Sequence, residues 1–403
     1  MNDVKLAELR RTPNALAPHY SQFQVAKRLL LSGHSHQAWP DFALEGQIEA
    51  FQDAARDVDE KWGRAFAKAD EVRAGLRTFL DDPQAELALG ASTHELVLRF
   101  LSALDLRRRP RIVTTLGEFH TLRRQLTRLG EAGLDVVALP VDPVDTLAER
   151  LAGAADERTA AVFVSSVLFE TSRIVPGLGE LAERCLLRGV ELVVDAYHAI
   201  GPAAFSIPGQ GLSSAWVLGG GYKYLQLGEG NCFMRVPAHA EGMRPVVTGW
   251  FAEFDALSDE HEPGKVAYGT GASRFAGATY DPTSHYRAAR VFWFFAQHGL
   301  TPAFLRRVYQ HHVGLLVARF DALNAPEALI TRDRTTPLEG LGGFLSLRTA
   351  RAGELQRALA ARGVRTDSRA DYLRLGPAPY LSDDQIVSAV DILGEVLRET
   401  PWT

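Results

Sequence analysis

Short apolar segments alternate with amphipathic segments between residues 85 and 195, and this alternation constrains the fold more than any other feature. The apolar segments lie at residues 85–89, 111–115, 134–138, 160–165 and 191–194. The segments between them, at 93–104, 120–130, 145–153 and 177–188, have the spacing of helices. Strands that are apolar throughout are buried on both faces. The sequence therefore predicts an α/β fold with a mostly parallel sheet covered by helices on both sides.

The pattern is different on either side of this region. A single long helix is predicted at 42–80, with an apolar stripe from Phe42 to Phe66. After about residue 285, a long helical region leads to short strand-like pieces and a final helix at 382–398. We predict a large domain at 41–285 and a smaller α+β domain at 286–403. The N-terminal segment, 1–40, is expected to pack with the small domain.

Composition excludes several classes of function. The net charge is −5, and the one dense basic cluster, Arg107–Arg111, is interpreted as a solvated linker, so no nucleic-acid partner is expected. The only two cysteines, Cys185 and Cys232, exclude a disulfide framework and fit a cytoplasmic location. No segment has the length of a membrane span or the apolar core of a secretory signal. His34 and His36 lack a third ligand nearby, so no metal site is predicted.

An aspartate and a lysine stand out as candidate functional residues. Asp195 ends the apolar segment ELVVD, and His198 comes three residues later. Lys223 follows in GGGYKYL, where the glycines predict close approach of a ligand and Tyr222 adds a hydroxyl. Ligands of open α/β sheets bind at the carboxyl ends of the strands. Pyridoxal 5′-phosphate (PLP) requires a lysine that forms an imine and a carboxylate that pairs with the ring nitrogen, so these residues predict PLP.

Longer motifs resemble a known family. DAYHAIGPAAFSI, WVLGGGYKYL and the pair Gly249-Trp250 are similar to the class V aminotransferase superfamily of fold-type I PLP enzymes, and most of all to kynureninases. STHELVLRFL, RIVTTLGEF and RGVRTDSRADYLRLGPAPY extend the resemblance over most of residues 30–380. It implies a large domain with a mostly parallel seven-stranded sheet and a smaller α+β C-terminal domain. It also implies a homodimer with sites at the interface.

The resemblance assigns site residues position by position. Ser92 and Thr93 would hold the phosphate at a helix N-terminus. Two alternatives stay open: Thr93 could simply cap that helix, and Asp195 could be the N-cap of a helix that follows its strand. Phe119 would stack on the ring, with His120 as the alternative. The full cofactor-binding set is Ser92, Thr93, Phe119, Asp195, His198, Tyr222, Lys223, Trp250 and Thr279. Lys223 and Asp195 would be the catalytic pair, and Arg374, Ser35 and His34 would bind an amino-acid substrate.

This sequence departs from the family pattern at several substrate positions. Leu122 replaces an acidic residue, Thr279 replaces an asparagine, and residues 34–37 read HSHQ where the family has Asn-Ser-Leu-Gly. These positions concern the substrate and not the cofactor, so the identity of the substrate stays open.

The leading hypothesis for activity is a kynureninase-like hydrolase that cleaves the Cβ–Cγ bond of a γ-keto amino acid, giving alanine and an aryl acid. The alternative is another class V activity on a different amino acid, such as that of an aminotransferase, an epimerase or a lyase. Desulfuration is disfavoured because Cys185 lies in a helical pattern and Cys232 in a strand-like one. A binding module that has lost catalysis is the third hypothesis, against which the intact lysine and aspartate argue.

Overall fold

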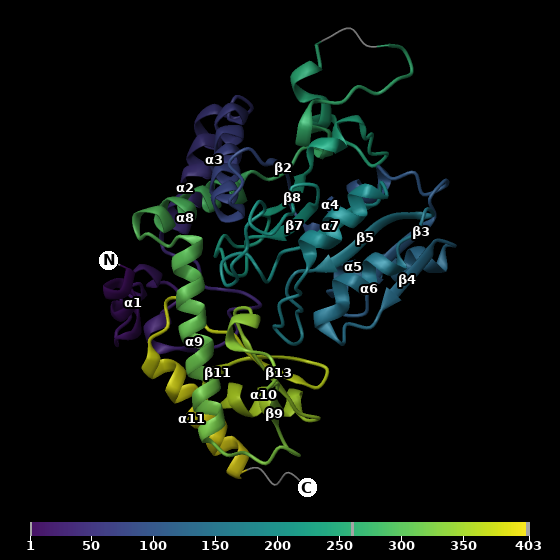
Figure 1. Ribbon diagram of the computed structural model, residues 1–403. Coiled ribbons are helices and arrows are strands. Elements are labelled where there is room, and N and C mark those ends of the chain that lie inside the picture. Colours follow the sequence, from purple (N-terminus) through teal and green to yellow (C-terminus); the bar gives the residue numbers. More distant parts are fainter. Residues whose placement is uncertain (1, 259–261, 400–403) are drawn as a thin grey trace.

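The structure is a computed structural model that describes residues 2–258 and 262–399 (Figure 1). It confirms the α/β prediction and the seven-stranded, mostly parallel sheet. The strands run in the order β2-β8-β7-β6-β5-β3-β4, and only β8 pairs antiparallel with its neighbours. Their bounds are β2 (Glu86–Gly90), β3 (Arg111–Thr115), β4 (Asp135–Leu139), β5 (Thr159–Ser165), β6 (Glu191–Asp195), β7 (Trp216–Gly220) and β8 (Cys232–Val236).

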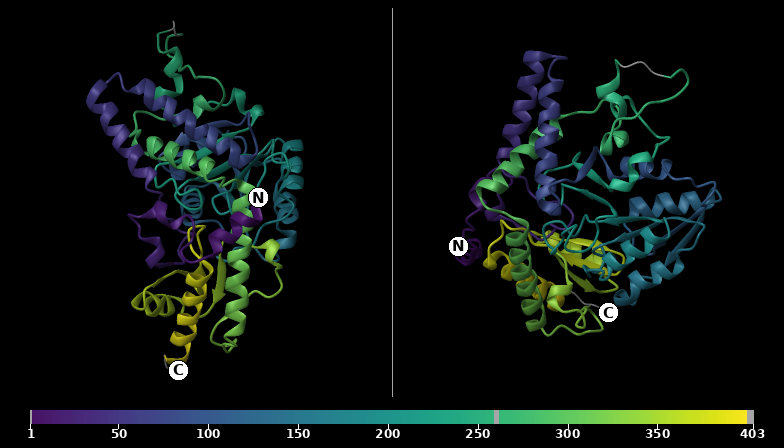
Figure 2. Two further views of the ribbon diagram at one scale, coloured as in Figure 1. Left: turned by 90° about the vertical axis from the view of Figure 1, so that its left-hand side faces the viewer. Right: turned by 45° about the horizontal axis from the view of Figure 1, so that its top comes forward.

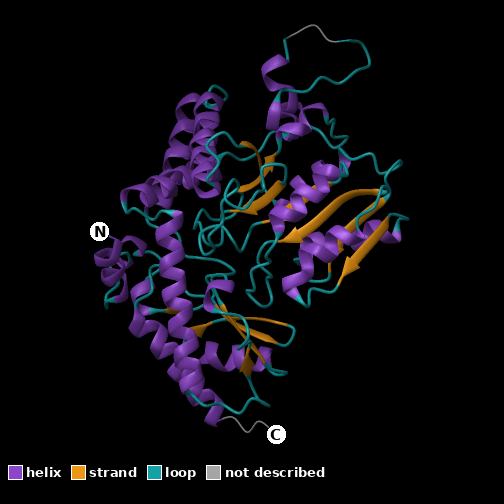
Figure 3. Ribbon diagram, in the orientation of Figure 1, coloured by secondary structure: helices purple, strands orange, loops and turns teal. Residues whose placement is uncertain are grey.

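Helices cover both faces of this sheet, as the apolar strands require (Figure 3). One face packs against α4 (Thr93–Ser102) and α5 (His120–Glu131), and the other against α6 (Leu147–Ala154) and α7 (Leu178–Leu187). Alternate residues of β5 show the division: Ala161 and Phe163 belong to the core beneath α4 and α5, whereas Val162 and Val164 belong to the core on the other side. Both faces of the central strands are therefore buried.

The predicted helix at 42–80 is two helices, α2 (Phe42–Asp57) and α3 (Trp62–Leu80). Val58 lies between them with a φ of 47° and a ψ of −97°, a non-helical conformation that ends α2. The predicted apolar stripe is also wrong for α2, because Phe51 is 76% exposed. Small residues form the buried face instead. A side chain at Gly46 would overlap the backbone of Tyr286, so α2 packs closely on α8 (Thr283–Gln297).

The C-terminal region is a separate layer of helices and a small sheet (Figure 1). Its four strands run in the order β12-β13-β10-β9. Their bounds, with those of the helices beside them, are α9 (Pro302–Ala322), β9 (Thr331–Arg332), β10 (Leu345–Arg348), α10 (Ala352–Ala361), β12 (Asp367–Arg369), β13 (Tyr372–Leu375) and α11 (Asp383–Glu399).

The N-terminal segment lies against this region (Figure 2). It begins with α1 (Asn2–Arg10), and its strand β1 (Leu29–Leu30) pairs in parallel with β11 (Val364–Arg365). The Asn14 side chain donates hydrogen bonds to the carbonyl oxygens of Pro379 and Leu381. These contacts fit the predicted division into domains, which stays a prediction.

The large sheet and the C-terminal region meet where β5 ends. Arg374 of β13 donates a hydrogen bond to the carbonyl oxygen of Phe169, in the loop that follows β5. The carboxyl edge of the parallel sheet therefore faces the C-terminal region. No helix in the described part of the chain is long and apolar enough to cross a membrane.

Candidate active site

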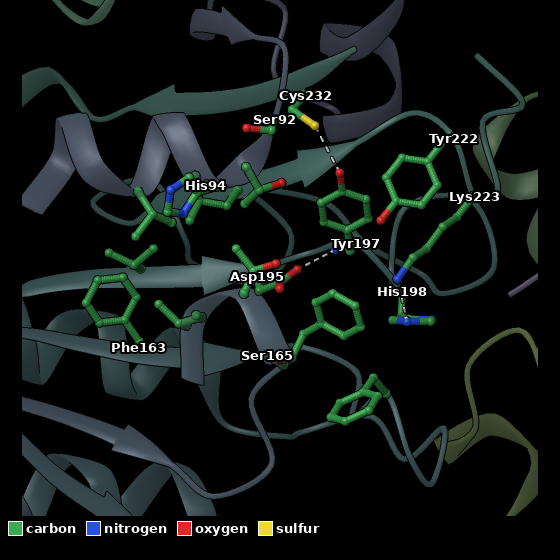
Figure 4. A pocket seen from close by; sticks show the side chains of 18 of the residues that line it. Ser92, His94, Phe163, Ser165, Asp195, Tyr197, His198, Tyr222, Lys223 and Cys232 are labelled. Carbon is green, nitrogen blue, oxygen red and sulfur yellow. Dashed lines mark hydrogen bonds between the residues drawn. The ribbon is translucent and has the colours of Figure 1, made fainter. Parts of the chain in front are cut away.

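A cavity of about 270 Å³ lies at the carboxyl ends of β5 and β6 (Figure 4). Parallel strands bring to this edge residues that are far apart in the sequence, which is where α/β sheets bind ligands. The structure brings together seven of the predicted site residues, all of which line the cavity: Ser92, Thr93, Phe119, Asp195, His198, Tyr222 and Lys223.

Lys223 is buried at this cavity, with 5% of its surface exposed. Its Nζ lies 2.8 Å from Nε2 of His198, within hydrogen-bond distance, and Nδ1 of the same ring lies 3.2 Å from the Tyr224 hydroxyl. Burial lowers the pKa of Lys223 to about 7, and the nearby Arg374 charge lowers it too, whereas Asp195 opposes the shift. A large share of the amine is therefore neutral and nucleophilic at neutral pH.

Asp195 ends β6 on the wall of the same cavity. One of its carboxylate oxygens accepts a hydrogen bond of 2.8 Å from the backbone N–H of Tyr197. Burial raises the pKa of Asp195, while that hydrogen bond and the charge of Lys223 act in the opposite direction. The carboxylate is held in one orientation in a setting of low polarity, where its charge acts strongly on any cation beside it.

Aromatic rings lie on both sides of the lysine. The Nζ of Lys223 is 5.1 Å from the ring centre of Phe119 and 4.9 Å from that of Tyr197. His120 does not line the cavity, and its Nδ1 lies 2.8 Å from the Arg123 guanidinium. Phe119 is therefore the ring that faces the lysine. Tyr197 was missed from the sequence, although it stands between the two predicted residues Asp195 and His198.

The N-terminus of α4 forms the opposite wall. Ser92 caps this helix, accepting a hydrogen bond from Glu95 N, and Thr93 is its first residue. The Thr93 hydroxyl is buried beside the Tyr197 hydroxyl and the Cys232 thiol and interacts with both. A helix N-terminus with a buried hydroxyl beside it is suited to an anionic group such as a phosphate.

The three glycines before Tyr222 have a different role from the one predicted. Side chains at Gly219 and Gly221 would overlap Phe233 and Leu227, and one at Gly220 would overlap the Tyr197 hydroxyl. The glycines therefore make room for side chains of this chain, and not directly for a ligand. Gly220 is the important one for the site, because it leaves room for the Tyr197 ring, which lines the cavity.

We expect Gly220→Ala to destabilise the protein by about 1–3 kcal/mol, the usual range for an overpacked core position. The added methyl would push the Tyr197 ring into the cavity. Urea unfolding would measure the loss, and the same substitution should cost much less in a Tyr197→Ala background. Gly63→Ala is the matched control, because nothing lies within 4 Å of a side chain there. An equal cost in both backgrounds would contradict this account of Gly220.

Arg374 is buried close to the site but does not line the cavity. Its guanidinium forms a 2.6 Å ion pair with Asp367, a residue the sequence analysis missed, and donates to Phe169 O at 2.5 Å. Its Nε has no partner among the described residues. Its charge lowers the pKa values of Lys223 and His198, so it lies within electrostatic reach of the lysine. Its role in carboxylate binding stays a prediction.

Of the two predicted substrate residues of the N-terminal segment, His34 lies beside this ion pair. His34 is fully buried, its ring stacks on Phe344 at 4.8 Å, and its Nε2 is 3.7 Å from Asp367. Burial lowers the pKa of His34 to about 4, so the ring is neutral at pH 7. The Ser35 hydroxyl lies 3.1 Å from His36 Nδ1. Neither His34 nor Ser35 lines the cavity, and their contact with substrate stays a prediction.

Trp250 and Thr279 are not brought to the cavity within one chain. The indole N–H of Trp250 donates to the Thr279 hydroxyl at 3.2 Å, and the Trp250 side chain is about half exposed. Thr279 lines a second, open cleft of about 900 Å³, which shares Glu229 and Gly230 with the first. A contact of either residue with the cofactor stays a prediction.

Two sequence comparisons give matches. Residues 318–393 match the family model of the kynureninase C-terminal domain. The isopenicillin N epimerase of Streptomyces clavuligerus is 27% identical over 190 residues, which cover 45% of this chain. The match spans about half the length of that relative, 47%.

Solved structures share the fold over nearly the whole chain. A lysine variant of C-DES, in which glycine is covalently linked to the PLP cofactor, has a TM-score of 0.80 at 15% identity and covers 94% of this chain and 98% of its own. The apo cysteine desulfurase of Thermococcus onnurineus has a TM-score of 0.79 at 16% identity, with coverage of 97% and 99%. Identities this low establish the fold and not the activity. They show that the chain has the fold-type I architecture of these PLP enzymes, and the sequence matches add a similarity of its C-terminal region to the kynureninase C-terminal domain.

Proposed function

We propose that the chain is a PLP-dependent hydrolase that cleaves the Cβ–Cγ bond of kynurenine or a related γ-keto amino acid. The observation that carries this proposal is the buried amine of Lys223, with the Asp195 carboxylate on the wall of the same cavity. The match of residues 318–393 to the kynureninase C-terminal domain supports the choice of reaction.

The residues of the cavity fit PLP. Lys223 would hold the aldehyde carbon, and Asp195 would face the ring nitrogen. The hydroxyl of Thr93 and the N-terminus of α4 would hold the phosphate. Phe119 and Tyr197 would flank the ring. When bound, PLP supplies an electron sink for negative charge that develops at the substrate Cα.

The side chains of this chain would do the remaining work. The neutral Lys223 amine would remove the Cα proton, and His198, hydrogen bonded to it, would hold that amine in place. The negative charge of the Asp195 carboxylate would favour the protonated form of the ring nitrogen that it faces. One water is consumed overall. Its oxygen is added to the γ-carbonyl carbon, the Cβ–Cγ bond breaks, and this carbon becomes the carboxyl carbon of the aryl acid. Cβ gains a proton and Cα regains the one that Lys223 removed, which gives alanine.

The substrate assay for this proposal is to supply L-kynurenine and 3-hydroxykynurenine separately and to measure alanine. Leu122 and Thr279 differ from the kynureninase pattern, and a site that loses a hydrogen bond to its substrate changes its preference, so we expect plain L-kynurenine to be a poor substrate. If the enzyme releases alanine from none of the γ-keto amino acids tested but transfers an amino group to a keto acid, transamination replaces the hydrolase proposal.

Epimerisation at Cα is the second candidate, favoured by the 190-residue match to isopenicillin N epimerase. It would use the same proton removal by Lys223, followed by return of a proton to the other face without bond cleavage. Exchange of the Cα proton for deuterium, with appearance of the D-isomer and no alanine, would identify it. Desulfuration by a cysteine nucleophile is disfavoured, because both cysteines are buried and burial raises their pKa values, that of Cys185 to about 12.

The predicted homodimer belongs to this proposal. It would place Trp250 and Thr279 of one copy near the cavity of the other. The exposed apolar side chains of α2 and α8, namely Leu44, Ile48, Phe51 and Trp293, are of the kind that a second copy would cover. Sedimentation of the purified protein would test this.

We expect Arg374→Ala to lower kcat/KM about 30- to 100-fold for every amino-acid substrate, because a charge-assisted pair with the α-carboxylate contributes roughly 2–3 kcal/mol. Arg348→Ala is the control, an exposed arginine on the neighbouring strand β10. Steady-state kinetics on several amino acids would measure both variants. Unchanged values for Arg374→Ala would mean that the carboxylate binds elsewhere.

A further inference from the structure

A buried carboxyl group that the proposed mechanism does not use lies beside Asp195. Glu118, in the turn between β3 and α5, is only 1% exposed. The Thr115 hydroxyl donates to its Oε1 at 2.6 Å, and Ser165 donates to it twice, from the backbone N–H at 3.1 Å and from the hydroxyl at 2.7 Å. No lysine or arginine forms an ion pair with Glu118 in the part of the chain described. A buried acid without a cation is rare in proteins and calls for an explanation.

The contacts of Glu118 join three strand ends in a row. Thr115 ends β3, Ser165 ends β5, and Ser165 is the register partner of Asp195 at the end of β6. The next residue, Ser166, donates to the backbone carbonyl of Asp195 from both its N–H and its hydroxyl. Glu118 is thus linked through one serine and its neighbour to the position of the Asp195 carboxylate.

Glu118 is also tied to the ring on the other side of the cavity. It directly precedes Phe119, whose ring centre lies 5.1 Å from the Lys223 amine. The three hydrogen bonds to Glu118 fix the turn that carries this ring. Loss of the carboxyl group would therefore loosen two walls of the cavity at once.

The charge state of Glu118 is set by its surroundings. Burial raises its pKa to about 7, and the Asp195 charge adds to the shift, whereas the bonds from Thr115 and Ser165 oppose it. The titratable groups around it are Asp195 on β6, then Lys223 and His198 across the cavity, and His120 on α5, whose pKa is lowered by burial and by Arg123. Glu118 and Asp195 are thus adjacent carboxyl groups on one edge of the sheet, and the charge of each affects the electrostatic potential in the cavity.

We propose that Glu118 is a positioning residue of this site, which holds Asp195 and Phe119 in place through Ser165 and carries a proton whose loss makes the Asp195 edge more negative. The inference rests on the proposed function, in which Asp195 faces the PLP ring nitrogen and Lys223 carries the cofactor. Ionisation of Glu118 would strengthen the preference of that edge for a positive charge on the bound cofactor.

Glu118→Gln separates the charge from the geometry. The amide oxygen can accept from Thr115 and from Ser165 N, and the amide nitrogen can donate to the Ser165 hydroxyl, which accepts as readily as it donates. Only the titratable proton is lost. Glu118→Ala removes both functions. Glu180→Gln is the control, because Glu180 is an exposed glutamate in the first turn of α7.

The first measurement uses the cofactor-free protein. The folded-state pKa of Glu118, about 7, lies above its ordinary value of 4.5. Its contribution to stability is therefore fully present below pH 4.5 and is lost as the pH rises to about 7. We expect the melting temperature of the wild type to fall over this window by more than that of Glu118→Gln, with Glu180→Gln behaving as the wild type. If the melting temperatures of the wild type and of Glu118→Gln fall equally steeply with pH, the proposal is overturned.

The second measurement is a pH titration of the visible absorbance of the cofactor bound to lysine. Removal of a nearby negative charge lowers the pKa of a cation, so Glu118→Gln should move the midpoint down by on the order of one pH unit. A midpoint unchanged in Glu118→Gln would overturn the role toward the cofactor, even with the melting result in place. If the wild type carries no cofactor on a lysine, the proposed function fails, and the role of Glu118 toward the cofactor fails with it. The melting curves still measure the titration of Glu118 in that case.

Discussion

Lys223→Ala is expected to abolish both the lysine-bound absorbance of the cofactor and all turnover. The amine of Lys223 is the only lysine nitrogen among the residues that line the cavity, so no neighbouring amine in the described chain can replace it. Covalent attachment and removal of the Cα proton would be lost together, and such steps account for many orders of magnitude in rate.

Borohydride reduction followed by peptide mapping would measure the attachment. Lys223→Arg is the informative second variant, because it keeps a positive charge but cannot form an imine, and Lys265→Ala, an exposed lysine, is the control. A reducible adduct that persists in Lys223→Ala would show that another lysine carries the cofactor.

The lowered pKa of Lys223 gives the same prediction a pH dependence. Only the neutral amine forms an adduct, and burial lowers its pKa to about 7 from the ordinary 10.5. The rate at which PLP attaches to the cofactor-free protein should therefore rise with pH and level off a little above 7. A rate that keeps rising steeply to pH 10 would mean that the lysine is solvated, unlike the buried side chain described here.

Asp195→Ala is expected to reduce kcat by several orders of magnitude while part of the PLP stays bound. The carboxylate would hold the ring nitrogen protonated, and without it the electron sink is weakened. Cofactor binding would survive in part because the lysine, the aromatic rings and the N-terminus of α4 do not depend on it. Single-turnover kinetics and the bound-cofactor spectrum would measure the two effects separately.

Asp195→Asn is the matched variant, since the amide keeps the size and the hydrogen bond from Tyr197 N but loses the charge. It should be nearly as inactive as Asp195→Ala if the charge matters. Near-normal activity of Asp195→Asn would limit the aspartate to a structural role, such as ordering the turn after β6.

The fold and the core of the site could be predicted from the sequence because both depend on local patterns. Continuous apolar segments of strand length can only be buried between two layers of helices, and this determined the parallel sheet. The topology of such a sheet places strand ends along one edge, so Asp195 at the end of β6 could be predicted to face a ligand. The Lys223 and Thr93 motifs added the opposite walls of the cavity.

The tertiary structure alone decided which side chains share that edge and in which charge state. Nothing in the sequence indicated that a side chain at Gly220 would overlap Tyr197, that Asp367 pairs with Arg374, or that Glu118 binds Ser165 of another strand. The break at Val58 and the buried face of α2 also depended on packing against α8. Periodicity reports which residues prefer burial, but partners distant in the chain, and the desolvation that shifts the pKa values of Lys223 and Glu118, exist only once the strands are brought together.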